Sequence, residues 1–164
     1  MEAIRPARAA DAPLIASLIR EVGLELGWPR PDDPRETEAQ VERQLGTCLA
    51  SDAHDVYVVP MTEGDAAEGE AAEEVAAYLA VHWLPCLLLP GSVGYVSELF
   101  VRPAARGQGL GTALLEAAAA EGRRRGGFRL ELVNHRERES YARRFYAKQG
   151  WTERDEMAVF KLPL

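Results

Sequence analysis

Residues 93–112 read VGYVSELFVRPAARGQGLGT, and this stretch decides the fold. Its first half is rich in β-branched and aromatic residues, which is typical of a strand. Its second half holds three closely spaced glycines, Gly107, Gly109 and Gly111, and an Ala- and Leu-rich segment then runs to Arg125. The stretch therefore predicts a strand, a glycine-rich turn and a helix in direct succession.

In the sequence before this stretch, the spacing of apolar residues changes between the helical and the strand pattern, and these changes separate the expected elements. Asp11 is a plausible helix N-cap and Pro13 suits a first helical turn, whereas the prolines between Gly27 and Pro34 exclude regular structure there. The expected elements are a strand at 3–6, a helix after Asp11, a loop at 27–34, a helix at 35–50, and strands at 55–60 and 75–83 joined by an acidic loop.

The sequence after the stretch predicts four further features. The Gly126-Gly127 pair ends the helix, a strand follows at 128–133, a helix at 138–149 ends at Gly150, and Trp151 with Met157–Leu162 forms a closing hairpin. This order of strands and helices predicts a mixed α/β layer architecture in a single domain over residues 1–164.

Charge and hydropathy exclude several classes of partner. The formal net charge of the 164 residues is -7, which argues against a nucleic-acid surface because duplex binding depends on Lys and Arg. No window approaches the roughly 20 apolar residues of a membrane span, and the N-terminus lacks the basic-then-apolar order of a signal peptide. We therefore expect a cytoplasmic protein without a membrane or nucleic-acid partner, whose acidity suits a cationic substrate.

The cysteines and histidines predict no metal site. Cys48 and Cys86 are far apart in the sequence, which favours two separate thiols over a disulfide or a metal pair. His54, His82 and His135 lack the spacing of metal ligands, so structural or exposed roles are expected for them.

The glycine-rich turn suits a diphosphate. Glycines at a strand-to-helix turn let the backbone approach a ligand, and the N–H groups of the first helical turn point outwards with the positive end of the helix dipole. Arg106 adds charge at the rim of this turn. A flexible connection is the simpler alternative.

Two nucleotide-binding motifs are excluded. The phosphate loop of nucleoside triphosphatases needs Gly-Lys-Ser or Gly-Lys-Thr, and Gly109-Leu110-Gly111 stands at that place. The dinucleotide fingerprint agrees in spacing with Gly107, Gly109 and Thr112, and Glu131 lies about 20 residues further on. Too little chain follows Glu131 to complete a doubly wound sheet.

Two motifs resemble the GCN5-related N-acetyltransferase (GNAT) family. Residues 97–103 followed by 106–111, RGQGLG, resemble its coenzyme A-binding motif, whose core is Arg or Gln, two residues, Gly, one residue, and Gly or Ala. Downstream, Phe145-Tyr146 followed by Gly150-Trp151 resembles the family helix that ends in Phe-Tyr, a few residues, Gly and an aromatic. The resemblance covers the chain in element order and is strong over 95–151.

The resemblance implies a fold and a co-substrate, acetyl-coenzyme A, with no metal. The fold is a mixed, mostly antiparallel sheet flanked by helices, in which the strands at 95–101 and 128–133 splay apart to admit the pantetheine arm. Many relatives have Asn where this chain has Glu139, and Asn134 offers a similar amide. The implied cofactor contacts are Leu99, Phe100, Val101, Arg106, Gly107, Gln108, Gly109, Leu110, Gly111, Thr112 and Asn134.

The resemblance also implies two catalytic side chains for direct transfer in a ternary complex. An amine with a pKa of about 10.4 must lose a proton before it attacks a thioester, and Glu98 is the expected general base. Strand alternation places Glu98 on the same face as Val96 and Phe100. Tyr146 matches the tyrosine that protonates the leaving thiolate. The alternatives are a solvent-facing or arginine-paired Glu98 and a Tyr146 that only packs.

The acyl acceptor is open. Trp28, His82 and Trp83 are candidate walls of a substrate mouth, where aromatic and acidic groups suit an amine. Small amines, amino acids, polyamines, antibiotics and protein N-termini all fit these features, and the family implies a homodimer. A coenzyme A-binding sensor without catalysis, transfer of a larger acyl group, and transfer to oxygen are the alternative functions.

Overall fold

The structure is a computed structural model that describes residues 4–28, 34–61 and 74–163. These residues belong to two compact units, Met1–Leu132 and Val133–Leu164. Within the described residues, no helix has the length and apolar character that crossing a membrane requires.

The first unit contains a five-stranded sheet in the order β1-β2-β3-β4-β5. Neighbouring strands are antiparallel from β1 to β4, and β5 runs parallel to β4. This arrangement confirms the mixed, mostly antiparallel sheet. The strands are β1 (Arg5–Pro6), β2 (His54–Pro60), β3 (Val75–Leu84), β4 (Val93–Val101) and β5 (Arg129–Leu132).

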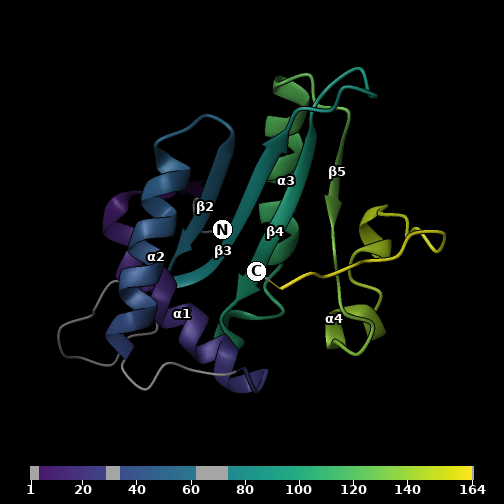
Figure 1. Cartoon of the computed structure of the whole chain (residues 1–164). Helices are drawn as coiled ribbons and strands as arrows, with labels where there is room; N and C mark the ends of the chain where they lie inside the picture. Colours follow the sequence, from purple (N-terminus) through teal and green to yellow (C-terminus); the bar gives the residue numbers. More distant parts are fainter. Residues whose placement is uncertain (1–3, 29–33, 62–73, 164) are drawn as a thin grey trace. The chain divides into compact units, whose positions relative to one another are not determined.

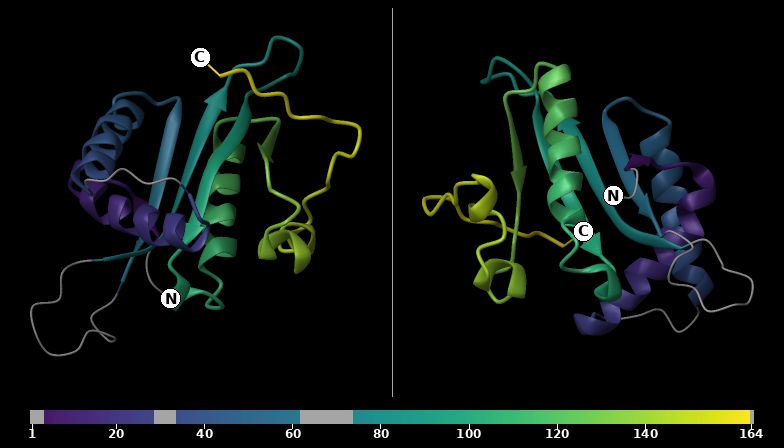
Figure 2. Two further views of the ribbon diagram at one scale, coloured as in Figure 1. Left: turned by 60° about the horizontal axis from the view of Figure 1, so that its bottom comes forward. Right: turned by 180° about the vertical axis from the view of Figure 1, so that it is seen from behind.

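Helices cover both faces of this sheet. Helices α1 (Ala12–Glu25) and α2 (Pro34–Leu49) lie on one face, and α3 (Leu110–Arg124) lies on the other (Figures 1 and 2). These bounds agree with the predicted helices. In the predicted loop at 27–34, residues 29–33 lie outside the described residues, and Pro34 begins α2.

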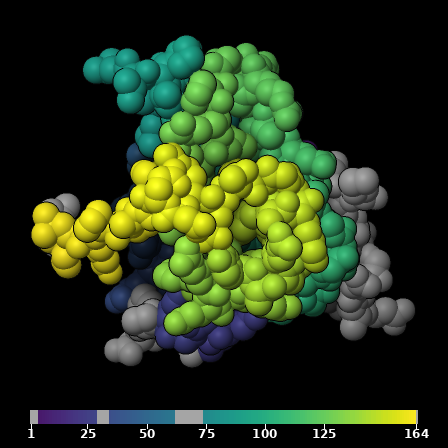
Figure 3. All heavy atoms as spheres, turned by 90° about the vertical axis from the view of Figure 1, so that its right-hand side faces the viewer, coloured from purple at the N-terminus to yellow at the C-terminus, as the bar shows by residue number. Residues whose placement is uncertain are grey.

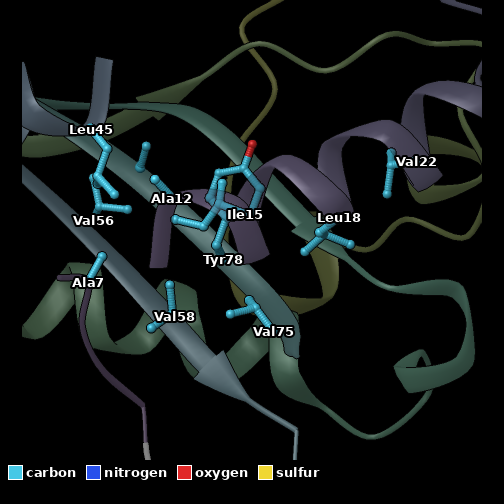
Figure 4. Close-up of a cluster of buried hydrophobic side chains, with 11 residues drawn as sticks. Ala7, Ala12, Ile15, Leu18, Val22, Leu45, Val56, Val58, Val75 and Tyr78 are labelled. Carbon is cyan, nitrogen blue, oxygen red and sulfur yellow. The ribbon is translucent and has the colours of Figure 1, made fainter. Parts of the chain in front are cut away.

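The α1–α2 face holds an apolar core in which β2 and β3 supply alternate residues (Figure 4). Tyr78 is its largest buried side chain, with 2% of its surface exposed. The buried residues of this core are Ala7, Ala12, Ile15, Leu18, Val22, Leu45, Val56, Val58, Val75, Tyr78 and Ala80.

The opposite face closes around Trp83, which is 6% exposed. A Cβ added at Gly94 would lie 2.4 Å from the indole Cζ3, and one at Gly122 of α3 would lie 3.1 Å from Cη2. The indole Nε1 donates a 2.6 Å hydrogen bond to Asp55 Oδ2. The two glycines therefore let the sheet and α3 close on the indole, and the expectation that Trp83 lines a substrate mouth is wrong.

The second unit contains a short helix, α4 (Glu139–Ala142), and a 3-10 turn, η3 (Ala147–Gln149). The helix predicted at 138–149 is broken because Arg144 has a left-handed φ of 55°. The predicted closing hairpin is also wrong, since the described residues 151–163 contain no strand. Two ion pairs, Arg136 with Glu153 and Arg154 with Glu156, involve the first half of this segment. The apolar side chains of its second half, Met157, Val159, Phe160 and Leu162, are exposed. An isolated two-stranded hairpin is marginal in water.

A glycine comparison tests the packing around Trp83. We expect Gly94→Ala to destabilise the protein by about 2 kcal/mol or more, because the new methyl group would overlap Trp83 and Leu130 Cδ2, each 2.4 Å away. Gly46→Ala in α2, where a Cβ meets nothing within 4 Å, should instead stabilise it by roughly 0.5–1 kcal/mol. Urea denaturation measures both, and equal effects of the two substitutions would contradict this packing.

Candidate functional site

A β-bulge in β4 determines which way the candidate base points. Val81 of β3 pairs with Val96, but the preceding residue, Ala80, pairs with Glu98, so Ser97 is an extra residue in β4. One extra residue reverses the side-chain alternation beyond it. Glu98 consequently lies on the α1–α2 face and Val96 on the α3 face, and the expectation that the two share a face is wrong.

The Glu98 side chain is exposed and is held by a buried phenol. The Tyr78 hydroxyl donates a 2.9 Å hydrogen bond to Glu98 Oε2. Burial, the nearby Glu98 charge and this hydrogen bond raise the pKa of Tyr78 well above its ordinary value. The phenol therefore stays neutral and remains a donor, and Glu98 has a tyrosine partner that orients its carboxylate.

Beyond the bulge, β4 has an open edge. The pairing of β4 with β5 covers only Val93–Val96, which stand opposite Arg129–Leu132. Among the described strands of the first unit, Glu98–Val101 pair with β3 alone. The backbone of Leu99, Phe100 and Val101 lies on this edge, where an extended ligand has room to pair as an added strand.

The glycine-rich turn presents backbone donors at the start of α3. Gly107 and Gly109 have left-handed φ values of 80° and 81°, and Gly109 is the residue before the helix. The first hydrogen bond of the helix runs from Ala113 N to Gly109 O at 3.0 Å. The N–H groups of Leu110–Thr112 therefore have no acceptor within the helix, and they can donate hydrogen bonds to a diphosphate.

Two arginines join this turn to α1. The Arg106 guanidinium donates two 2.6 Å hydrogen bonds to Glu25, and its Nε donates to Val101 O at 3.3 Å. The buried Arg102 pairs with Glu21. Arg106 lies beside the turn, and Glu25 partly compensates its charge.

Three side chains of types that can bind a metal ion meet on the Glu98 face. His54 stands opposite His82 across β2 and β3, and their Nδ1 atoms are 2.8 Å apart. Cys48 near the end of α2 completes a group whose ligand atoms all lie within 4.8 Å of one another. Spacing along the sequence missed this group because strand pairing and the end of α2 assemble it.

The polar surroundings of His82 connect this group to the bulge. Its Nε2 lies 2.7 Å from Ser97 Oγ. Burial and the charge of His54 lower the pKa of His82, and burial with the charge of Glu98 raises the pKa of the Cys48 thiol. The imidazole is therefore neutral and the thiol protonated near pH 7.

Of the predicted substrate walls, Trp28 and His82 share the face of Glu98. Trp28 makes an edge contact with Phe100, with ring centroids 5.6 Å apart, and Phe100 is two residues from Glu98 in β4. Trp28 is 37% exposed, so part of the indole surface faces solvent. Trp83 lies on the opposite face, as described above.

The second unit holds the remaining predicted residues. Burial raises the pKa of Tyr146, whose ring contacts Phe145 and Trp151. Its hydroxyl is therefore protonated at neutral pH. Asn134 Oδ1 accepts a hydrogen bond from Ser140 Oγ at 3.2 Å, and its Nδ2 is buried without a partner among the described residues.

Comparison with known proteins identifies the family. The Acetyltransferase (GNAT) family profile matches residues 19–151. This chain belongs to the GNAT acetyltransferase family. No curated protein matches it. The predicted membership of the family is thereby confirmed, and this family implies acyl transfer from acetyl-coenzyme A.

Solved structures share the whole fold. A candidate acetyltransferase from Arthrobacter sp. FB24 is 30% identical, with a TM-score of 0.75 over 100% of this chain and 97% of that one. A predicted acetyltransferase from Clostridium acetobutylicum, solved with acetyl-CoA, is 21% identical, with a TM-score of 0.71 over 98% and 96%. The ribosomal-protein-alanine N-acetyltransferase from Brucella melitensis biovar Abortus 2308 is 18% identical, with a TM-score of 0.69 over 100% of both chains. The last two show a common fold alone.

A substitution at Gly109 tests the diphosphate site. We expect Gly109→Val to lower the affinity for acetyl-coenzyme A at least tenfold, on the order of 1.4 kcal/mol, because a branched side chain would disturb the left-handed backbone and crowd the donors. Gly126→Val, at a φ of 67° beyond the other end of α3, matches the strain and should leave affinity unchanged. Calorimetric titration measures both, with NAD as a ligand that should not bind. Equal affinities in the two variants would contradict the assignment of the diphosphate site to this turn.

Proposed function

We propose that this protein is an N-acetyltransferase that moves an acetyl group from acetyl-coenzyme A onto a primary amine by direct transfer. Membership of the GNAT family supports the acetyl donor. The position of Glu98 carries the acceptor half of the proposal: an oriented carboxylate stands beside the open edge of β4, where the thioester would lie. The GNAT match runs across both compact units, which supports one domain over 1–164.

Each group in the reaction then has a defined task. Glu98 takes a proton from the ammonium of the acceptor, directly or through water, and the free amine attacks the thioester carbonyl. The carbon–sulfur bond breaks as the amide forms, and the thiolate of coenzyme A takes the Tyr146 proton. The attacking nitrogen then gives up its second proton, which restores Tyr146 to the phenol and leaves a neutral amide. Family correspondence assigns Tyr146 to this task, and its raised pKa supplies a protonated phenol.

The side of the sheet that carries Glu98 suits a cationic acceptor. Trp28 offers an aromatic ring face, His82 is neutral, and Glu98 supplies negative charge. An ammonium group is attracted to both a ring face and a carboxylate. Because GNAT enzymes act on small-molecule or peptide amines, we propose such an amine as the acceptor, in the cytoplasm, with a homodimer as the expected assembly.

Replacing Glu98 tests the base. With an acceptor amine found by thiol release, Glu98→Gln should lower kcat/KM at pH 7 by about 10²–10³-fold, because the amine is then almost wholly protonated and no carboxylate removes its proton. The loss should shrink as the pH approaches about 10, where the amine deprotonates in water. The measurement is the pH profile of turnover.

Two outcomes of this test separate the alternatives. Glu131→Gln, a strand glutamate paired with Arg129, is the matched control and should keep the normal profile. An unchanged profile for Glu98→Gln would contradict the base. Acetyl-coenzyme A binding without thiol release for any amine would favour a binding module.

Replacing Tyr146 tests the acid. Tyr146→Phe should lower kcat about 10²-fold, because the departing thiolate loses its proton donor, while affinity for acetyl-coenzyme A changes little. Tyr141→Phe removes an exposed hydroxyl that donates to Glu153 at 2.9 Å and should leave kcat unchanged. Steady-state kinetics and calorimetry distinguish these effects. Full turnover in Tyr146→Phe would reassign this residue to packing.

A further inference from the structure

Cys48, His54 and His82 lie outside the two sequence motifs that resemble the family, and none of them transfers a proton or forms a bond in the proposed reaction. They come from α2, β2 and β3, which lie side by side in the first unit (Figure 1). All three side chains are half-buried, and their ligand atoms lie within 4.8 Å of one another. One thiol and two imidazoles at this separation form a ligand set.

We propose that Cys48, His54 and His82 bind a zinc ion as three protein ligands. Sulfur and imidazole nitrogen suit Zn²⁺, whereas Mg²⁺ and Ca²⁺ require oxygen ligands. Three protein ligands leave the fourth position of a tetrahedron open to water or a small ligand.

The ligand atoms lie within 4.8 Å of one another, so side-chain movements of about one ångström complete the geometry. With Zn–N of about 2.05 Å and Zn–S of about 2.3 Å, a tetrahedral ion holds two nitrogens roughly 3.3 Å apart and a nitrogen and a sulfur roughly 3.6 Å apart. The two Nδ1 atoms, at 2.8 Å, would separate by about half an ångström. The two rings already meet edge to face, with an interplanar angle of 75°, so their nitrogens can converge on one point without stacking.

A hydrogen bond outside the ligand set orients His82 for this task. Its Nδ1 faces His54, and its Nε2 lies 2.7 Å from Ser97 Oγ. A proton on Nε2, donated to Ser97, leaves Nδ1 as a lone-pair ligand. Metal-bound histidines commonly donate their second ring N–H to such a partner.

The charges on this face also suit a dication. Binding converts the Cys48 thiol to a thiolate and releases its proton to water, so the complex of ion and ligands carries one net positive charge. Glu98 lies close enough to influence both Cys48 and His82 electrostatically, and its carboxylate balances that remaining charge. The second cysteine, Cys86, does not belong to this group.

Cobalt is the first probe, because tetrahedral Co²⁺ bound to a thiolate absorbs visibly and in the near ultraviolet. Chelator-treated full-length protein, free of coenzyme A, is titrated with Co²⁺ and then with Zn²⁺. We expect one equivalent of Co²⁺ with a thiolate-to-cobalt band, its displacement by Zn²⁺, and a Tm raised by several degrees in excess Zn²⁺. Absence of the band, or of any shift in Tm, overturns the proposal.

Matched variants assign the ligands. Cys48→Ser should abolish the thiolate band, and His54→Gln or His82→Gln should weaken Co²⁺ binding at least about tenfold. Cys86→Ser and His135→Gln change the other cysteine and the other histidine and should bind normally. A full band in Cys48→Ser, or its loss in Cys86→Ser, overturns the site. If Cys48→Ser does not fold, the histidine variants decide the question by the same titration.

This test is separate from that of the acetyltransferase function. Cys48→Ser should bind acetyl-coenzyme A as the original protein does, since the glycine-rich turn is unchanged. Loss of metal binding with normal acetyl-coenzyme A binding supports the zinc site. Absence of acetyl-coenzyme A binding in the original protein would instead count against the proposed function alone.

Discussion

The extra residue Ser97 in β4 is the constraint on which the candidate site depends. If Ser97 were an ordinary paired residue of the strand, alternation would place Glu98 with Val96 on the face that packs against α3, where a carboxylate would lose its hydration without compensation. With the extra residue, Glu98 meets the Tyr78 hydroxyl on the α1–α2 face. Pairing between β4 and β5 ends just before Ser97, so the bulge marks both the change of face and the start of the open edge. Bulges near active sites commonly re-aim a side chain in this way.

Helix α1 positions the cofactor turn through arginine contacts that span 81 residues of sequence. The pair of Arg106 with Glu25 is exposed, and such pairs contribute about 0–1 kcal/mol, so its main effect is to fix geometry. Arg102 is buried, and loss of its partner Glu21 would leave only Glu74, 3.8 Å from its Nε, to compensate the buried charge, which is costlier. The start of α3 is therefore placed by the sheet on one side and by α1 on the other.

Local patterns made much of the first unit predictable. The strand at 93–101 and the helix after Gly109 follow from apolar period and glycine placement, which act within a few residues. The bulge was not predictable, because register depends on the partner strand. The helix predicted at 138–149 is interrupted at Arg144, which has a left-handed backbone conformation. Arginine rarely adopts this conformation, so the residue type does not predict it. Trp83 shows a similar limit: its aromatic character suggested a substrate wall, yet Gly94 and Gly122 make room for it in the core.

Strand register also explains why the candidate base and the candidate zinc ligands are neighbours. The pairing that places His54 opposite His82 continues through β3 to the bulge, where Ser97 meets His82 and Glu98 meets Tyr78. A shift of one residue between β3 and β4 would separate both pairs at once, whereas a substitution at Cys48 changes only the candidate zinc ligands. The two chemistries therefore share one structural cause, because the register that brings His82 to Ser97 also brings Glu98 to Tyr78.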